Sequence, residues 1–144
     1  GLPANVNFVP HVIKNSEMNQ VYNVADVNLS GCSGAEGFNL PFFNSLCLGK
    51  QAVGVRAHAH LDFASNENSI LFEPRELIDI SDGLFFSHGG IFNQGGMYDW
   101  DEDKVIEAME KAEKIAKVPN LEGEKLAEKF SVKNTATILL KALL

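Results

Sequence analysis

Glu36 and Asn44 stand at the two ends of a run whose residue types suit binding of a sugar bearing neighbouring hydroxyl groups. The run reads Glu-Gly-Phe-Asn-Leu-Pro-Phe-Phe-Asn and leads from a turn of small residues into an expected helix. The Glu36 carboxylate can accept hydrogen bonds from sugar hydroxyls. The Asn44 amide, farther along the helix, offers both a donor and an acceptor, which suits a ribose diol.

The backbone between these two side chains is expected to bind an anion. The first N–H groups of a helix have no partner within the helix, and the helix dipole favours negative charge there. The N–H groups of Phe38, Asn39 and Leu40 could therefore bind a diphosphate, and Gly37 would let the ligand approach the backbone closely. Diphosphate and sugar sites in one turn predict a nucleoside-diphosphate sugar as the ligand.

A second candidate site is the sequence His58-Ala-His60-Leu-Asp62, which follows an expected strand. This spacing is close to the HxHxDH signature of the metallo-β-lactamase fold, in which histidine and aspartate side chains hold zinc. The sixth position here is Phe63 rather than a histidine, and the two other histidines have no such signature around them. A zinc hydrolase is therefore kept as an alternative, whereas the main hypothesis predicts no metal.

The elements around both candidate sites alternate between strand and helix. Helices are expected at 16–22, capped by Ser16, and from Pro41 to just before Gly49. Strand patterns occupy 6–9, 26–30, 52–55 and 70–72. This alternation predicts an α/β fold, a Rossmann-like parallel sheet with flanking helices, and ligands then bind at the carboxyl ends of the strands.

The second half of the chain has a different pattern, although we expect residues 1–144 to form a single domain. Residues 1–82 would hold the strand and helix alternation, 83–98 a glycine-rich loop or irregular hairpin, and 99–144 amphipathic C-terminal helices. Asp99 is expected to cap the first of these helices together with Glu102. Its apolar face would consist of Val105, Met109, Ala112 and Ala116.

Composition narrows the class of protein. The 144 residues are 45% hydrophobic and carry a net charge of −7, which makes a nucleic-acid partner unexpected. The sequence contains neither an apolar run long enough for a membrane span nor a signal-peptide pattern, so a cytoplasmic location is expected. The two cysteines, Cys32 and Cys47, lack a disulfide pattern and are expected to be reduced.

Five blocks in order resemble the donor lobe of GT-B glycosyltransferases, specifically the retaining nucleotide-sugar transferases. They read Asn5-Val-Asn-Phe-Val-Pro, Val21-Tyr-Asn-Val-Ala-Asp, Glu36-Gly-Phe-Asn-Leu-Pro, Gly49-Lys-Gln-Ala-Val-Gly-Val and Ile70-Leu-Phe-Glu-Pro. The resemblance implies that Glu36 is the catalytic-site carboxylate near the transferred sugar. It places the diphosphate and sugar at the backbone of 38–40 and puts Val12 beside the base.

The chain departs from the family pattern at two site positions. Asn44 replaces the family's second Glu, and Asn39 replaces its second Gly. Nothing matches the Gly-Arg and Lys-Gly residues that neutralise the diphosphate in the family, so we expect a piece of a longer protein. An N-terminal acceptor lobe or a partner chain would complete it, and we expect either a partner chain or an oligomer.

The resemblance therefore implies a glycosyltransferase that moves a sugar from a nucleoside diphosphate to a hydroxyl acceptor, without a cofactor. We expect this chain alone to bind its donor weakly and to transfer nothing. The alternative is a non-catalytic binding or assembly subunit that keeps the same fold.

Overall fold

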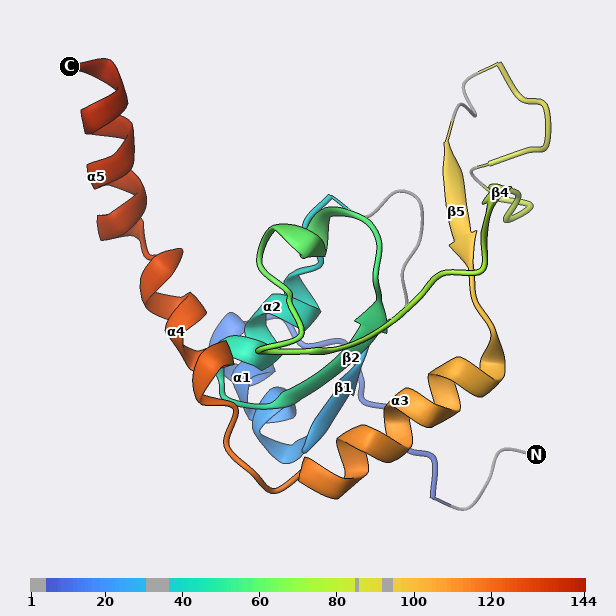
Figure 1. Ribbon diagram of the computed structural model, residues 1–144, viewed down its shortest axis with the longest axis horizontal. Helices are drawn as coiled ribbons and strands as arrows, with labels where there is room; N and C mark the ends of the chain where they lie inside the picture. The colour runs from blue at the N-terminus through green and yellow to red at the C-terminus, as the bar shows by residue number, and fades with distance from the viewer. Residues whose placement is uncertain (1–4, 31–36, 85, 92–94) are drawn as a thin grey trace.

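A three-stranded parallel sheet lies at the centre of the computed structural model, which describes residues 5–30, 37–84, 86–91 and 95–144 (Figure 1). Its strands are β1 (Val27–Leu29), β2 (Gln51–Val55) and β3 (Ile70–Phe72), in the order β1-β2-β3. Val27 pairs with Gln51 and Val53 pairs with Ile70. Because neighbouring strands run in the same direction, each connection crosses from one end of the sheet to the other.

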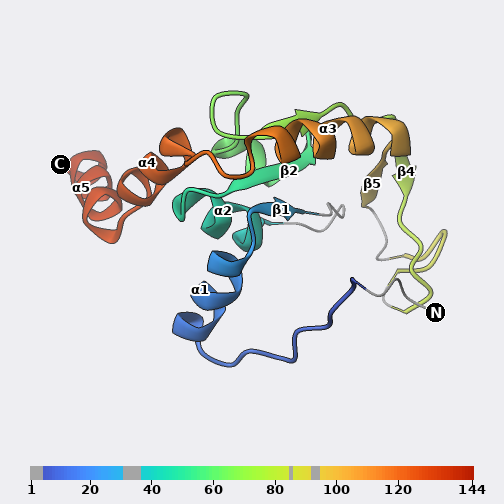
Figure 2. The same ribbon diagram turned by 90° about the horizontal axis from the view of Figure 1, so that it is seen from below.

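Helices cover both faces of this sheet (Figure 2). Helix α2 (Leu40–Cys47) packs against β1 and β2 on one face, and α3 (Glu102–Ile115) packs against all three strands on the other. Helix α4 (Leu121–Lys129) lies against α2. The approach of α4 to α2 is close, since a Cβ on Gly123 would lie 2.7 Å from the carbonyl oxygen of Leu46.

Strand β2 is buried along its whole length, which explains its run of small and β-branched residues. Val53 and Val55 pack toward α3, while Ala52 packs toward α2. A Cβ on Gly54 would lie 2.8 Å from Cε2 of Phe42, so glycine allows α2 to approach the strand. The cluster on the α3 face contains Val53, Val55, Ala57, Phe72, Ala108 and Ala112, and the cluster on the α2 face contains Phe42, Leu46, Ala52, Phe63, Ala64 and Leu126.

The expected α/β class with a parallel sheet flanked by helices is confirmed, as are the strands at 26–30, 52–55 and 70–72. The expected strand at 6–9 is wrong, because residues 6–13 are irregular and no strand among the described residues pairs with them. The Phe8 side chain there is 82% exposed. Helix α1 (Asn15–Val24) forms, but its N-cap is Lys14 rather than Ser16.

Two antiparallel strands form a second, separate sheet after the parallel one. Strand β4 (Glu76–Asp79) pairs with β5 (Gly96–Asp99), in which Asp99 lies opposite Glu76. The expectation that Asp99 caps the following helix is therefore wrong. Asp101 is the cap, and its side chain accepts a hydrogen bond of 2.9 Å from the backbone N–H of Asp103.

The C-terminal helices differ in how much they bury. On α3 the buried positions are Ala108 and Ala112, whereas the Met109 side chain is 45% exposed and lies off the apolar face expected for it. Helix α5 (Val132–Leu143) has no buried residue and projects away from the sheet (Figure 1). Among the described residues, no helix combines the length and the apolar character that crossing a membrane requires.

Candidate functional site at the carboxyl edge of the sheet

The turn before α2 is built around Asn39, which is 1% exposed and has φ 67° and ψ 63°. Its Oδ1 accepts hydrogen bonds from the Ser30 hydroxyl at 2.9 Å and from the Phe42 N–H at 3.3 Å. Ser30 follows β1, so Asn39 joins the carboxyl end of that strand to the start of the helix. Left-handed backbone favours glycine and tolerates asparagine, which accounts for the residue type at this position.

The cap reduces the number of backbone donors available to a ligand. The Phe42 N–H is bound by the Asn39 side chain and the Phe43 N–H by the Asn39 carbonyl, while Pro41 has no N–H. Leu40 is therefore the residue of the first helical turn whose N–H has no hydrogen-bond partner among the described residues. The Asn39 cap thus takes the Phe42 N–H away from a ligand, while the N–H groups expected to bind one, those of Phe38, Asn39 and Leu40, stay a prediction.

Gly37 and Phe38 lead into this turn with opposite environments. Gly37 is exposed, and a Cβ on it would meet no atom of the described residues within 4 Å. The ring of Phe38 packs against Phe43 at 5.2 Å and Phe63 at 5.0 Å between centroids. This aromatic contact holds the turn against the core while the backbone of Gly37 stays accessible.

Asn44 lies four residues after Leu40 on α2, so the two side chains share one face of the helix. The Leu40 side chain is 60% exposed, and Asn44 is half-buried beside it. Glu36, the expected catalytic carboxylate, lies outside the described residues. The described part of the candidate site therefore consists of 37–40 and Asn44.

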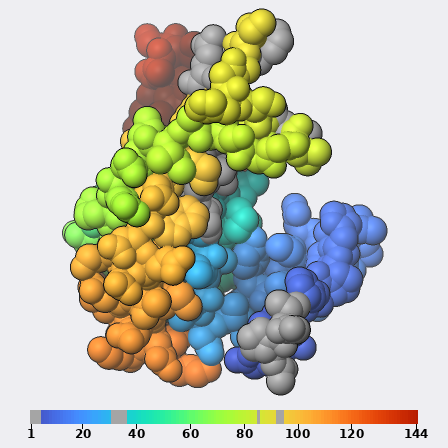
Figure 3. All heavy atoms as spheres, turned by 90° about the vertical axis from the view of Figure 1, so that its right-hand side faces the viewer, coloured from blue at the N-terminus to red at the C-terminus, as the bar shows by residue number. Residues whose placement is uncertain are grey.

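Val12 is half-buried and lies in a separate hollow of about 530 Å³ between the N-terminal segment and α1. Figure 2 shows the segment before α1 standing apart from the sheet. Figure 3 shows this segment and α1, in blue, on the opposite side of the molecule from α3, in orange. The structure groups 37–40 and Asn44 along α2 but does not place Val12 against them. The hollow is lined by Val9, His11, Val12, Glu17, Gln20, Val21, Val24 and Ala25.

The His58, His60 and Asp62 side chains have three different environments. His60 is fully buried, and its Nε2 lies 2.6 Å from the carbonyl oxygen of Val55. The His58 ring contacts that of Tyr98 in β5 with centroids 4.8 Å apart, and Asp62 is exposed. Within the described ranges, no three histidine, cysteine, aspartate or glutamate side chains form a group that could hold a metal.

Two polar contacts at this edge were not anticipated from the sequence. Arg56 and Glu73 follow the adjacent strands β2 and β3, and the Arg56 Nε donates to Glu73 Oε1 at 2.6 Å. The Arg56 guanidinium also donates to Asn66 Oδ1. Opposite charges directly after neighbouring parallel strands are the signal that could have identified this pair.

On α2, burial raises the pKa of the Cys47 thiol.

No protein-family model matches the chain, and a search of curated proteins finds no relative.

Proposed function

We propose that this chain is the nucleotide-sugar-binding part of a GT-B glycosyltransferase that transfers a sugar to a hydroxyl acceptor. The observation that carries the proposal is the turn at 37–40, which lies between the end of β1 and the start of α2 at the carboxyl edge of a parallel sheet. Ligands of such sheets bind at this edge. The open backbone at Gly37 provides the close approach that a diphosphate needs.

The same turn explains how one departure from the family pattern is accommodated. Asn39 stands where the family has glycine, and its backbone has the left-handed conformation that glycine adopts most readily. Asparagine is the next best residue there, and its side chain also fixes the turn to Ser30. The replacement therefore supports a preserved turn with fewer free donors, and so a weaker diphosphate site.

The proposed chemistry divides between the backbone and two side chains. Negative charge develops on the diphosphate as its bond to the sugar breaks, and the Leu40 N–H with the α2 dipole would stabilise it without a metal. Glu36 would contact the transferred sugar, and Asn44 would bind a hydroxyl pair of the ligand. Retention of configuration belongs to the same proposal and follows from the resemblance alone.

Titration calorimetry with UDP-glucose, GDP-glucose and ADP-glucose tests this proposal. Gly37→Ala adds a methyl group where no atom of the described residues lies within 4 Å, so it should leave the melting temperature unchanged. It should weaken binding of the preferred donor about tenfold, since the methyl occupies the space of the ligand. Glu36→Ala should also weaken binding. Glu110→Ala, which replaces an exposed glutamate on α3, is the matched control and should leave binding unchanged.

The second candidate is a non-catalytic binding or assembly subunit, favoured by the apolar side chains of α5 that stay more than half exposed, which are Val132, Ile138, Leu139, Leu140 and Leu143. It predicts no heat with any of the three donors, and no transfer after the chain is joined to an acceptor lobe. Zinc is titrated in the same series. Heat with zinc and none with nucleotide would instead favour the histidine cluster.

A further inference from the structure

His58 has a backbone conformation that is almost restricted to glycine. Its φ of 67° and ψ of −170° fall in a region where a side chain clashes with the neighbouring backbone. The other non-glycine residue with positive φ in the described ranges, Asn39, has ordinary left-handed angles. His58 is therefore the most strained position that the structure describes.

The surrounding contacts hold His58 in this conformation. The His58 carbonyl accepts a hydrogen bond from the Leu61 N–H at 3.2 Å, which closes the short helix η1 (Ala59–Asp62). His60 is anchored beneath the strand by its contact with Val55. The His58 ring packs on Tyr98 from β5, a segment far away in the sequence. Strain of this kind persists where a fold forces it, and such positions cluster at functional sites.

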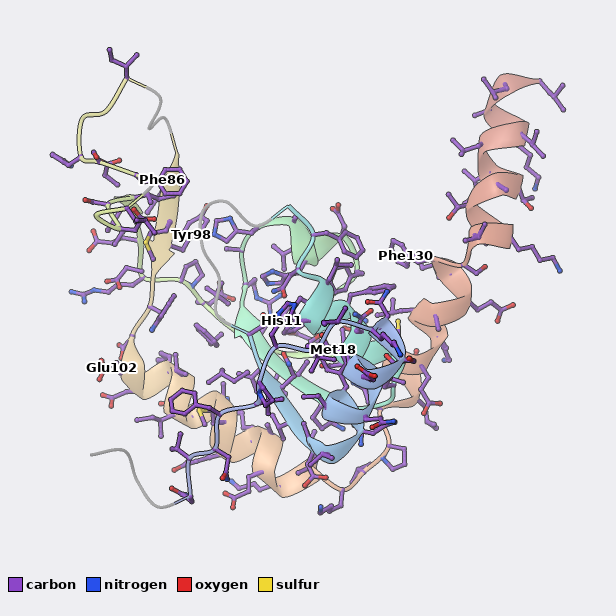
Figure 4. All side chains as sticks on the ribbon, turned by 180° about the vertical axis from the view of Figure 1, so that it is seen from behind. His11, Met18, Phe86, Tyr98, Glu102 and Phe130 are labelled. Carbon is purple, nitrogen blue, oxygen red and sulfur yellow. The ribbon has the colours of Figure 1, made fainter. Side chains whose placement is uncertain are left out.

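His58 lies at the same edge of the sheet as the proposed donor site. It follows β2, the central strand, at the same edge of the sheet as the start of α2. The ring of His60, two residues on, lies 5.3 Å from Phe42 in the first turn of α2. Figure 4 shows Tyr98 on the strand that rises beside this edge. A histidine with a strained backbone thus follows the central strand at the edge of the sheet where the diphosphate is proposed to bind.

We infer that His58 is a donor-binding residue whose imidazole hydrogen-bonds the sugar–diphosphate end of the nucleotide sugar. This inference rests on the proposed function. An imidazole N–H can donate to a phosphate or hydroxyl oxygen, which glycine at this position could not do. Glycine would adopt this backbone conformation without strain, so histidine lowers the stability of the fold. A role in ligand binding would explain why histidine is present there.

The inference predicts opposite effects of one substitution on stability and on binding. His58→Gly removes the strain and should raise the melting temperature, or leave it unchanged, despite the lost contact with Tyr98. It should weaken binding of the preferred one of UDP-glucose, GDP-glucose and ADP-glucose about tenfold. Binding of the matching monophosphate, UMP, GMP or AMP, should not change. His88→Ala, at an exposed position in the β4–β5 region, is the control.

The outcomes separate this inference from the function on which it rests. His58→Asn, which keeps an N–H donor and the strained backbone, should recover part of the lost affinity. Unchanged donor affinity in His58→Gly, or an equal loss for the monophosphate, would overturn the role of His58 while the donor site stands. A wild-type chain that binds none of the three donors would overturn both. A clear fall in melting temperature with His58→Gly would show that the histidine is kept for packing and would also overturn the inference.

Discussion

At the scale of single residues, Asn120 connects three parts of the fold through one buried amide. Its Nδ2 donates to the carbonyl oxygens of Lys50 at 3.1 Å and Asn68 at 2.8 Å, and its Oδ1 accepts from the Gly123 N–H at 2.9 Å. Asn120→Ala would leave these buried groups without partners and remove the cap of α4. We expect it to lower the free energy of unfolding by about 2–4 kcal/mol, measured by urea denaturation.

Asn134 provides the matched control for this prediction. Its side chain also donates to a backbone carbonyl, that of Lys129 at 2.7 Å, but the contact is exposed. Asn134→Ala should change the free energy of unfolding by less than about 0.5 kcal/mol. Similar losses for the two variants would contradict the view that burial of the polar groups, rather than the hydrogen bond itself, sets the cost.

Residue chemistry in the sequence located the turn at 37–40 but could not give its internal hydrogen bonds. The helix start was visible from Pro41 and the glycines around it. The left-handed angles of Asn39 were not visible, because asparagine occurs in many turn conformations. The use of Asn39 Oδ1 as the cap depends on Ser30, which becomes a neighbour only when β1 and α2 pack together.

At the scale of elements, the face that α3 turns toward the sheet is made of small residues. Ala108 is 3% exposed and Ala112 is fully buried, so the helix lies close to the strands. Ala112→Leu would add three carbon atoms where no space remains. We expect it to lower the free energy of unfolding by about 1–3 kcal/mol, measured by thermal and urea denaturation.

Met109 on the same helix tests whether this face is correctly assigned. Its side chain is 45% exposed, so Met109→Leu should change the free energy of unfolding by less than about 0.5 kcal/mol. A large loss for Met109→Leu with none for Ala112→Leu would reverse the assignment. It would place Met109 on the buried face, as the sequence predicted, but would remove from that face Ala112, which the sequence also assigned to it.

The sequence predicted the elements that bury both faces better than those at the margins. The strands β2 and β3 stand out because short apolar runs are bounded by glycine, asparagine or proline. The run at 6–9 has the same composition, yet a strand forms only where another strand can pair with it. For α3, helical spacing identified an apolar face, but the choice between Ala108 and Met109 depended on the direction from which the sheet approaches.

At the scale of the whole molecule, the folded core ends with α4, and α5 adds nothing to it. Leu126 on α4 is 5% exposed and belongs to the cluster on the α2 face of the sheet, whereas no residue of α5 is buried. The free energy of folding comes mainly from apolar surface removed from water. Most of the stability of the chain should therefore lie before α5.

Two truncations test this division of the molecule. Removal of 132–144 should lower the free energy of unfolding by less than about 1 kcal/mol, since α5 contacts mainly α4 among the described elements and buries no residue of its own. Removal of 120–144 also deletes Asn120 and Leu126 and should cost more than about 4 kcal/mol, because burying Leu126 and satisfying the Asn120 network are both lost. Urea denaturation gives both values. In the variant that lacks 132–144, the dependence of the free energy of unfolding on urea concentration should fall only slightly, since α5 exposes little additional surface on unfolding. An equal cost for the two truncations would mean that α5 packs on the rest of the chain in solution.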